Sequence, residues 1–231
     1  MKSFIRALGR EAESRAAALA TNRGGETATL YFGGGTPSML SDTHLGHLME
    51  TLDRLVPVDK LDEFSFEANP ATFTEKKVRF WRSLGMTRVS LGVQSLDSGI
   101  LHLLGREHTP AQALHSVEML KNAGMPHINM DLMFAIPGQT LSIWEATLKE
   151  AVRAGTDHIS AYNLTYEEDT EFFRSLLRGE KRQDPDEDAA FFELAEHMLE
   201  AAGLRHYETS NYARELSLIH ISEPTRRTPI S

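Results

Sequence analysis

The sequence contains no cysteine, which excludes disulfide bonds and any site that depends on thiolate ligands. It also lacks an apolar run of about 18 residues, so no membrane-spanning helix is expected. Positive charge is scarce, because the sequence has 24 Lys and Arg residues and 33 Asp and Glu residues, which give a net charge of -9. Such an acidic chain is a poor match for nucleic acid or a membrane surface. Residues Met1–Gly9 are too short and polar for a signal peptide. We therefore expect a cytoplasmic protein without nucleic-acid partners.

Strand and helix patterns alternate along the 231 residues. Period-two patterns and short apolar runs predict strands over Ala28–Phe32, Glu63–Glu67, Arg88–Gln94, His127–Phe134 and His158–Leu164. Helical spacing predicts helices over Lys2–Leu19, Asp42–Leu55, Glu75–Leu84, Ala111–Asn122 and Leu141–Ala154, with a further helix beginning in the acidic Asp184–Asp188 and ending near Ala202. Ser41 and Thr74 are expected N-caps, and Gly85, Gly124 and Gly155 follow helices. Regular alternation predicts one α/β domain with parallel strands and right-handed crossovers.

Three of the predicted strands have one apolar and one largely polar face. Because side chains alternate along a strand, the polar faces are expected to hold Ser65, Glu67, Ser90, Gly92, Gln94, Asn129, Asp131 and Met133. The apolar faces should contact the helices, so the polar faces should point into the interior of a curved sheet. A polar interior is satisfied either by a ligand or by a buried hydrogen-bond network. The last polar residues lie near the carboxyl ends of the strands, where barrel sites form, and this favours a ligand.

The segment Gly33-Gly34-Gly35-Thr36-Pro37 follows a predicted strand directly. Glycines let the backbone approach a ligand without obstruction by Cβ, although a tight turn explains such a run equally well. The segment lacks the lysine of a nucleotide-binding P-loop. By position alone, Glu67 is also consistent with a cap of the Asn69-Pro70 turn, and Arg106 with a solvated loop arginine.

Histidine offers little evidence for a metal site. His44 and His47 have a usable spacing of three residues, but no carboxylate completes a recognised ligand set around them. We interpret both as surface positions of a helix and expect no metal site in this chain.

Four sequence strings identify a family. They are YFGGGTPSML (Tyr31–Leu40), FEANP (Phe66–Pro70), RVSLGVQSL (Arg88–Leu96) and NMDLMFAIPGQT (Asn129–Thr140). Together they resemble the S-adenosylmethionine-binding core of the oxygen-independent coproporphyrinogen III oxidase-like branch of radical SAM proteins. The resemblance implies an open, partial TIM-like (β/α)6 barrel whose first strand is missing here.

The same resemblance assigns binding roles to eight residues. It implies that Gly33, Gly34, Gly35 and Thr36 meet the amino group of S-adenosylmethionine. It directs Glu67 and Gln94 to the methionine or ribose part, Arg106 to the carboxylate and Asp131 to the ribose. These residue types suit the ligand, because a carboxylate accepts from ammonium or sugar hydroxyls and arginine binds a carboxylate.

Members of this family hold a 4Fe-4S cluster on a CxxxCxxC loop, which this sequence cannot supply. We therefore expect residues 1–215 to be a truncated radical SAM core, inactive and with no catalytic residue, whose longer parent carries the cluster. A natural cluster-free paralogue is the alternative. Leu216–Ser231 resembles a translated sequencing adaptor, so we expect a non-native tail there.

The segments NLTYEEDTEFFRSLLRGE (Asn163–Glu180) and YETSNYAR (Tyr207–Arg214) resemble the HemW-type haem chaperones within this branch. This resemblance implies that the parent protein binds haem and acts in haem trafficking. Two alternatives stay open. The parent is a porphyrinogen oxidase that decarboxylates propionate groups, or the chain is a cluster-free ligand-binding module.

Overall fold

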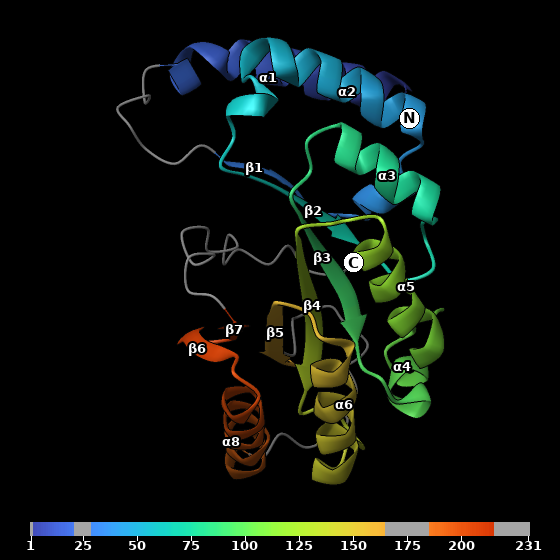
Figure 1. Ribbon diagram of the computed structural model, residues 1–231, viewed down its shortest axis with the longest axis vertical. Coiled ribbons are helices and arrows are strands. Elements are labelled where there is room, and N and C mark those ends of the chain that lie inside the picture. The colour runs from blue at the N-terminus through green and yellow to red at the C-terminus, as the bar shows by residue number, and fades with distance from the viewer. Residues whose placement is uncertain (1, 21–28, 165–184, 215–231) are drawn as a thin grey trace, which may run out of the picture.

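The computed structural model describes residues 2–20, 29–164 and 185–214, and its described strands form one mixed sheet (Figure 1). Five strands are parallel neighbours in chain order: β1 (Thr29–Phe32), β2 (Glu63–Ala68), β3 (Arg88–Gln94), β4 (His127–Phe134) and β5 (His158–Asn163). Two short antiparallel strands, β6 (Arg205–Glu208) and β7 (Asn211–Ala213), extend the sheet beyond β5 in the order β1-β2-β3-β4-β5-β7-β6. The sheet is open, as expected for a partial barrel.

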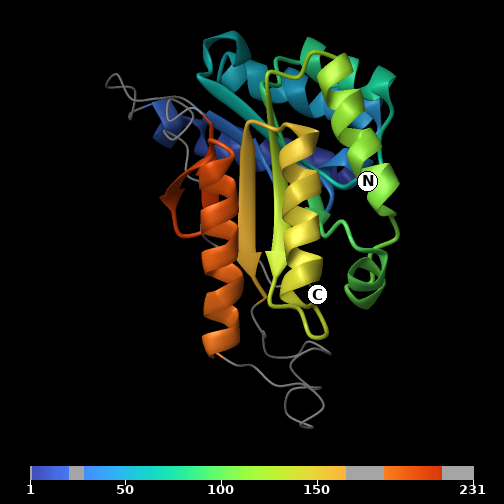
Figure 2. The same cartoon turned by 60° about the horizontal axis from the view of Figure 1, so that its bottom comes forward.

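Within the described residues, helices precede, connect and follow the parallel strands. In chain order they are α1 (Lys2–Ala20), α2 (Asp42–Leu55), α3 (Glu75–Ser83), α4 (Ser98–Leu103), α5 (Pro110–Asn122), α6 (Leu141–Ala154) and α8 (Pro185–Ala201), with 3-10 turns at Pro37–Met39 and Val58–Lys60. α1 lies against α2 at one end of the molecule, and α8 lies beside α6 next to β4 and β5 (Figures 1 and 2).

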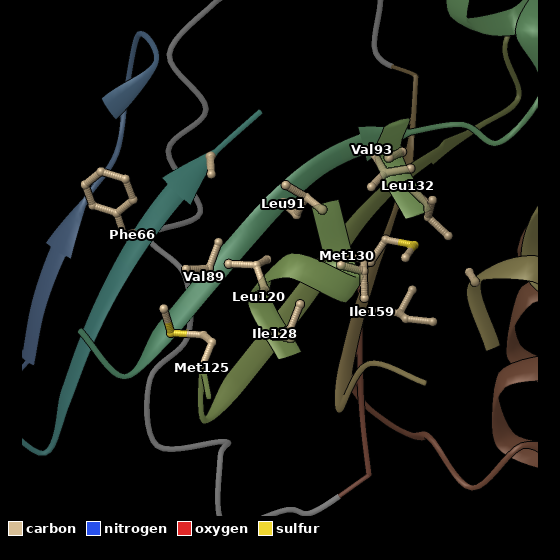
Figure 3. Packing of buried hydrophobic residues seen from close by; sticks show 14 of the residues in the cluster. Phe66, Val89, Leu91, Val93, Leu120, Met125, Ile128, Met130, Leu132 and Ile159 are labelled. Atoms are coloured by element: carbon tan, nitrogen blue, oxygen red, sulfur yellow. The ribbon is translucent and has the colours of Figure 1, made fainter. Parts of the chain in front are cut away.

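The main hydrophobic core lies between the sheet and its helices. The side chains of Val89, Leu91, Ile128 and Met130 are buried on one face of β3 and β4, and Leu120 of α5 packs against them (Figure 3). Large aromatic residues fill the rest of this layer. The rings of Phe66 and Trp81 are 4.8 Å apart, and those of Phe134 and Trp144 are 5.7 Å apart. The apolar faces predicted from strand alternation are therefore the helix-covered faces.

The predicted helix ends are confirmed. The hydroxyls of Ser41 and Thr74 accept hydrogen bonds from the backbone amides of His44 and Lys77. Gly85, Gly124 and Gly155 all have positive φ at the ends of helices. The predicted bounds of α2 and α6 match the observed ones, and those of α1, α3 and α5 differ by one residue.

Other elements differ from the expectation. The hairpin β6–β7 was not expected, because its strands are only four and three residues long and carry no clear alternation. β5 ends at Asn163 rather than at Leu164. Ala28, most of the Asn163–Glu180 string and the expected tail Leu216–Ser231 lie outside the described residues.

Candidate functional site

Polar side chains share the face of the sheet that is opposite to the helices. The Cα registers place Glu67, Ser90, Asn129 and His158 side by side across β2, β3, β4 and β5. Paired residues of neighbouring strands point to the same side of a sheet. The polar row therefore crosses the three strands for which alternation predicted a polar face, and it continues onto β5.

The glycine loop is attached to this row by Glu67. The backbone amide of Gly34 donates to Glu67 Oε2 at 3.0 Å, and the hydroxyl of Tyr31 donates to Oε1 of the same carboxylate. A Cβ at Gly33 would lie 2.9 Å from Glu67 Oε1 and would collide with the Tyr31 ring. At Gly34 and Gly35 nothing lies within 4 Å of such an atom, and both have positive φ. Gly33 thus makes room for the side chains of Tyr31 and Glu67, whereas Gly34 and Gly35 leave the backbone accessible to a ligand.

The exit of the loop is fixed by residues of the β2–α3 connection. Asn69 Nδ2 donates to Thr36 Oγ1 at 3.3 Å, and the Thr72 and Ser38 hydroxyls are 2.6 Å apart. Lys77 of α3 donates to the carbonyl of Ser38 at 2.5 Å. Glu67 has no part in these bonds, so its role here is to hold the loop rather than to cap the turn.

Asp131 lies further along the polar face and is held from two sides. Ser90 Oγ donates to Asp131 Oδ2 at 2.9 Å, and Asn129 Nδ2 donates to Oδ1 at 2.7 Å. Arg106 interacts electrostatically with the same carboxylate. Burial lowers the pKa of the Arg106 guanidinium, while the charge of Asp131 opposes that shift. The interpretation of Arg106 as a solvated loop residue therefore does not fit its surroundings.

Gln94 reaches the polar face by a different route from the one alternation predicts. A register shift separates Leu91 from Gln94 in the β3–β4 pairing, and Gln94 has a φ of 66°. A Cβ built on Gly92 would lie 3.1 Å from Gln94 Nε2 and 2.8 Å from Asn69 Oδ1. The side chain of Gln94 thus lies over Gly92 beside Asn69. The bulge turns it there, because simple alternation ends at the register shift.

The analysis of the sequence missed His158 and Tyr207. His158 Nδ1 lies 2.6 Å from Asn129 Oδ1, and His158 Nε2 lies 2.7 Å from the Tyr207 hydroxyl. Burial, with the nearby charge of Arg88, lowers the pKa of His158 to about 3. His158 was predicted only as the first residue of a strand, and the hairpin that brings Tyr207 to it had no sequence signal.

Charged and hydroxyl side chains are buried together in the amino-terminal half of the polar face. Glu63 and Arg88 are buried with 3.6 Å between Oε2 and Nη1, and Ser65 donates to the other Glu63 oxygen. Arg88 Nη1 pairs with Glu63 only by charge and makes no hydrogen bond to the described residues. The open polar groups are concentrated at the carboxyl ends of the strands.

An iron–sulfur cluster does not fit the residues of this chain. The sequence has no cysteine, and within residues 2–20, 29–164 and 185–214 no three His, Asp or Glu side chains gather into a possible metal site. The imidazole of His44 contacts the Ser41 hydroxyl, and that of His47 contacts Glu50 at the surface of α2. No helix in the described part of the chain has the length and apolar character to span a membrane.

Comparison with known proteins places this chain in a family. Residues 9–151 match the Radical SAM superfamily. The chain is 35% identical over 188 residues to the protein named heme chaperone HemW of Bacillus subtilis, covering 80% of this chain and 50% of that protein. It is 35% identical over 187 residues to the zebrafish mitochondrial radical S-adenosyl methionine domain-containing protein 1, covering 80% of this chain and 42% of that one. The chain spans about half the length of the curated relatives it matches.

Solved structures agree on the fold. Coproporphyrinogen III oxidase (HemN) of Escherichia coli, described as a radical SAM enzyme, superimposes with a TM-score of 0.80 at 23% identity, over 92% of this chain and 48% of that one. The Elp3 protein of Methanocaldococcus infernus superimposes with a TM-score of 0.64 at 22% identity, over 83% and 48%. The predicted open, mostly parallel barrel-like sheet is therefore confirmed, and the chain belongs to the radical SAM superfamily.

Proposed function

We propose that this chain binds the adenosyl and methionine parts of S-adenosylmethionine at the carboxyl ends of β1 to β4. The observation that supports this most directly is the pairing of the open glycine loop with Glu67. Glu67 accepts the hydrogen bond of the Gly34 amide, and nothing lies within 4 Å of a Cβ built on Gly34 or Gly35, so a ligand can approach the backbone there. Further along the same face, Asp131 and Arg106 offer one acceptor and one cation, which suit ribose hydroxyls and a carboxylate.

Each predicted residue has a part in this proposal. Gly33, Gly34, Gly35 and Thr36 would surround the amino group, with Glu67 as their support. Gln94 would contact the methionine or ribose part, Arg106 the carboxylate and Asp131 the ribose. S-adenosylmethionine supplies radical chemistry only beside a reducing cluster. Since the residues here do not fit the cluster, the proposal for this chain is binding and orientation, without a radical step.

We propose further that the whole protein handles haem or a porphyrin in the cytoplasm, and that residues 1–215 of this chain are a truncated radical SAM core of that longer protein. The support is the 35% identity to proteins named heme chaperone HemW. The second candidate is oxidative decarboxylation of a porphyrinogen propionate, favoured by the fold likeness to coproporphyrinogen III oxidase. Porphyrinogen turnover by a cysteine-containing longer protein would select the oxidase. Stoichiometric haem binding without turnover would select the chaperone.

Calorimetric titration with S-adenosylmethionine tests the binding proposal on the chain as it is. Asp131→Ala should weaken binding by about 1.5–3 kcal/mol, the range for a hydrogen bond to a charged group. Asp157→Asn is the matched control, because Asp157 binds His127 and the amide of Ile128 at the other ends of the strands. Absence of any heat at millimolar ligand, with folded protein, would refute the proposal.

A further inference from the structure

A chain of hydrogen bonds runs across the polar face from the β6–β7 hairpin to Asp131. The Tyr207 hydroxyl lies 2.7 Å from His158 Nε2, and His158 Nδ1 lies 2.6 Å from Asn129 Oδ1. Asn129 Nδ2 then lies 2.7 Å from Asp131 Oδ1. Asn129 and His158 are buried, at 0% and 1% exposure, so water does not compete for the bond between them.

The chemistry of these groups fixes the direction of every bond. A carboxylate oxygen accepts, so Asn129 must present its NH2 to Asp131 and its carbonyl to His158. The carbonyl also accepts, so His158 must carry its proton on Nδ1. Nε2 is then the acceptor, and the Tyr207 hydroxyl donates to it. One tautomer of His158 is therefore coupled to one orientation of the Asn129 amide.

This arrangement requires a neutral imidazole, since a protonated ring has no acceptor for the Tyr207 hydroxyl. Burial and the charge of Arg88 lower the pKa of His158, and Asp157 opposes them only in part. His158 is thus neutral throughout the physiological range.

A second set of bonds completes the support of the carboxylate. Ser90 donates to Asp131 Oδ2, so both oxygens are held on the side that faces the sheet. The hydroxyl of Ser160 lies 3.0 Å from Asn129 Nδ2 and 3.2 Å from Asn129 Oδ1, which restricts the rotation of the amide further.

We propose that Asn129, His158 and Tyr207 are positioning residues that orient Asp131 toward the ribose hydroxyls of an adenosyl ligand. The inference rests on the proposed binding function, and it extends the site to the antiparallel hairpin. Asn129 holds the carboxylate directly. His158 donates from Nδ1 to the Asn129 carbonyl and holds the amide in this orientation, and the Tyr207 hydroxyl, which donates to Nε2, holds the imidazole ring in place.

Binding of two nucleosides distinguishes a loss of positioning of Asp131 from a general loss of stability. 5′-Deoxyadenosine carries both ribose hydroxyls, and 2′,5′-dideoxyadenosine lacks the 2′ hydroxyl. The unmodified chain should prefer the first by about tenfold, the lower end for a hydrogen bond to a charged group. Asn129→Leu should remove most of that preference, and Tyr207→Phe should reduce it about threefold, within the range for coupled neighbours. Loss of stability alone would weaken both nucleosides equally.

Tyr212→Phe is the control for Tyr207→Phe, because it removes a hydroxyl from the same hairpin but from outside the chain of bonds. It should leave the preference unchanged. If Asn129→Leu does not fold, Tyr207→Phe decides, since it deletes one partly exposed oxygen. A preference that survives in both Asn129→Leu and Tyr207→Phe overturns the positioning role while the binding function stands.

Nitrogen-15 spectra of the histidine rings keep the inference testable if no nucleoside binds and the binding proposal itself fails. We expect His158 to carry its proton on Nδ1 at pH 7 in the unmodified chain, and the Nε2 resonance to shift in Tyr207→Phe. A proton on Nε2, or a charged ring at pH 7, would refute the directed chain of bonds. The expected tautomer with the expected shift would support it independently of any ligand.

Discussion

Gly33→Ala should damage the candidate site although it adds only one methyl group. Gly33 has no positive φ, so the backbone tolerates alanine, and the cost comes from space alone. The new Cβ would lie 2.9 Å from Glu67 Oε1, closer than real Cβ contacts occur, and would collide with the Tyr31 ring. Either the carboxylate or the ring must therefore move.

The expected loss of unfolding free energy follows from the packing and the hydrogen bonds that this movement disrupts. Forcing one methyl group into a filled space costs about 1–3 kcal/mol. Glu67 would also lose alignment with the Gly34 amide and the Tyr31 hydroxyl, the two bonds that fix the loop. We therefore expect the free energy of unfolding to fall by about 1–3 kcal/mol, and S-adenosylmethionine binding to weaken with it.

Gly46→Ala is the matched control. Gly46 lies within α2, and a Cβ there would meet only Phe80 Cζ at 3.8 Å, an ordinary contact. This change should stabilise the protein by about 0.5–1 kcal/mol, because alanine is the better helix former. Denaturant unfolding followed by circular dichroism measures both variants. If Gly33→Ala matched the unmodified chain in stability and binding, the reasoning about the loop would be wrong.

Three further outcomes are expected. Anaerobic reconstitution with iron and sulfide should give no protein-bound cluster absorption, because the chain has no thiolate; a stoichiometric cluster would contradict this. Burial raises the pKa of Asp157, but hydrogen bonds from His127 and backbone amides lower it more. The ionised Asp157 therefore contributes to the free energy of unfolding above about pH 4, and this contribution is lost as the pH falls toward the lowered folded-state pKa. Asp157→Asn should reduce the loss of unfolding free energy that is measured between pH 7 and 3. Deletion of residues 216–231 should leave the thermal midpoint unchanged, and a loss above about 1 kcal/mol would show a native packing segment there.

Much of the fold could be predicted because its signals are local. The helix faces and caps are set within a few residues, so Ser41, Thr74 and Gly155 marked real boundaries. Strand alternation identified the polar and apolar faces of β2 and β4. The β6–β7 hairpin could not be predicted in this way, because strands of three or four residues are stabilised by pairing with β5 rather than by their own pattern.

The site was predictable only in part for a related reason. Residue type and strand position pointed to Glu67 and Asp131, whose faces follow from simple alternation. Gln94 lies on a bulge and has a positive φ. This conformation is uncommon for glutamine, so the sequence alone gives no reason to predict it. Tyr207 and His158 are separated by 49 residues, and their contact depends on the hairpin.

The two halves of the polar face differ in burial and in how their polar groups are paired. At the amino ends of the strands, Glu63, Ser65 and Arg88 pair among themselves in a nearly dry environment. At the carboxyl ends, Glu67 and Arg106 are only partly buried, and Gly34 and Gly35 are open. A polar interior is thus not sufficient evidence for a ligand, since the buried groups at the amino ends of these strands interact with one another. A ligand is expected at the carboxyl ends of the strands, where donors and acceptors remain accessible and where glycines leave the backbone without Cβ atoms. Asp131 lies between the two halves, since Ser90 and Asn129 hold its two oxygens from within the sheet and Arg106 interacts with it electrostatically. That position is why its orientation, more than its presence, is expected to determine how well the chain recognises a ribose.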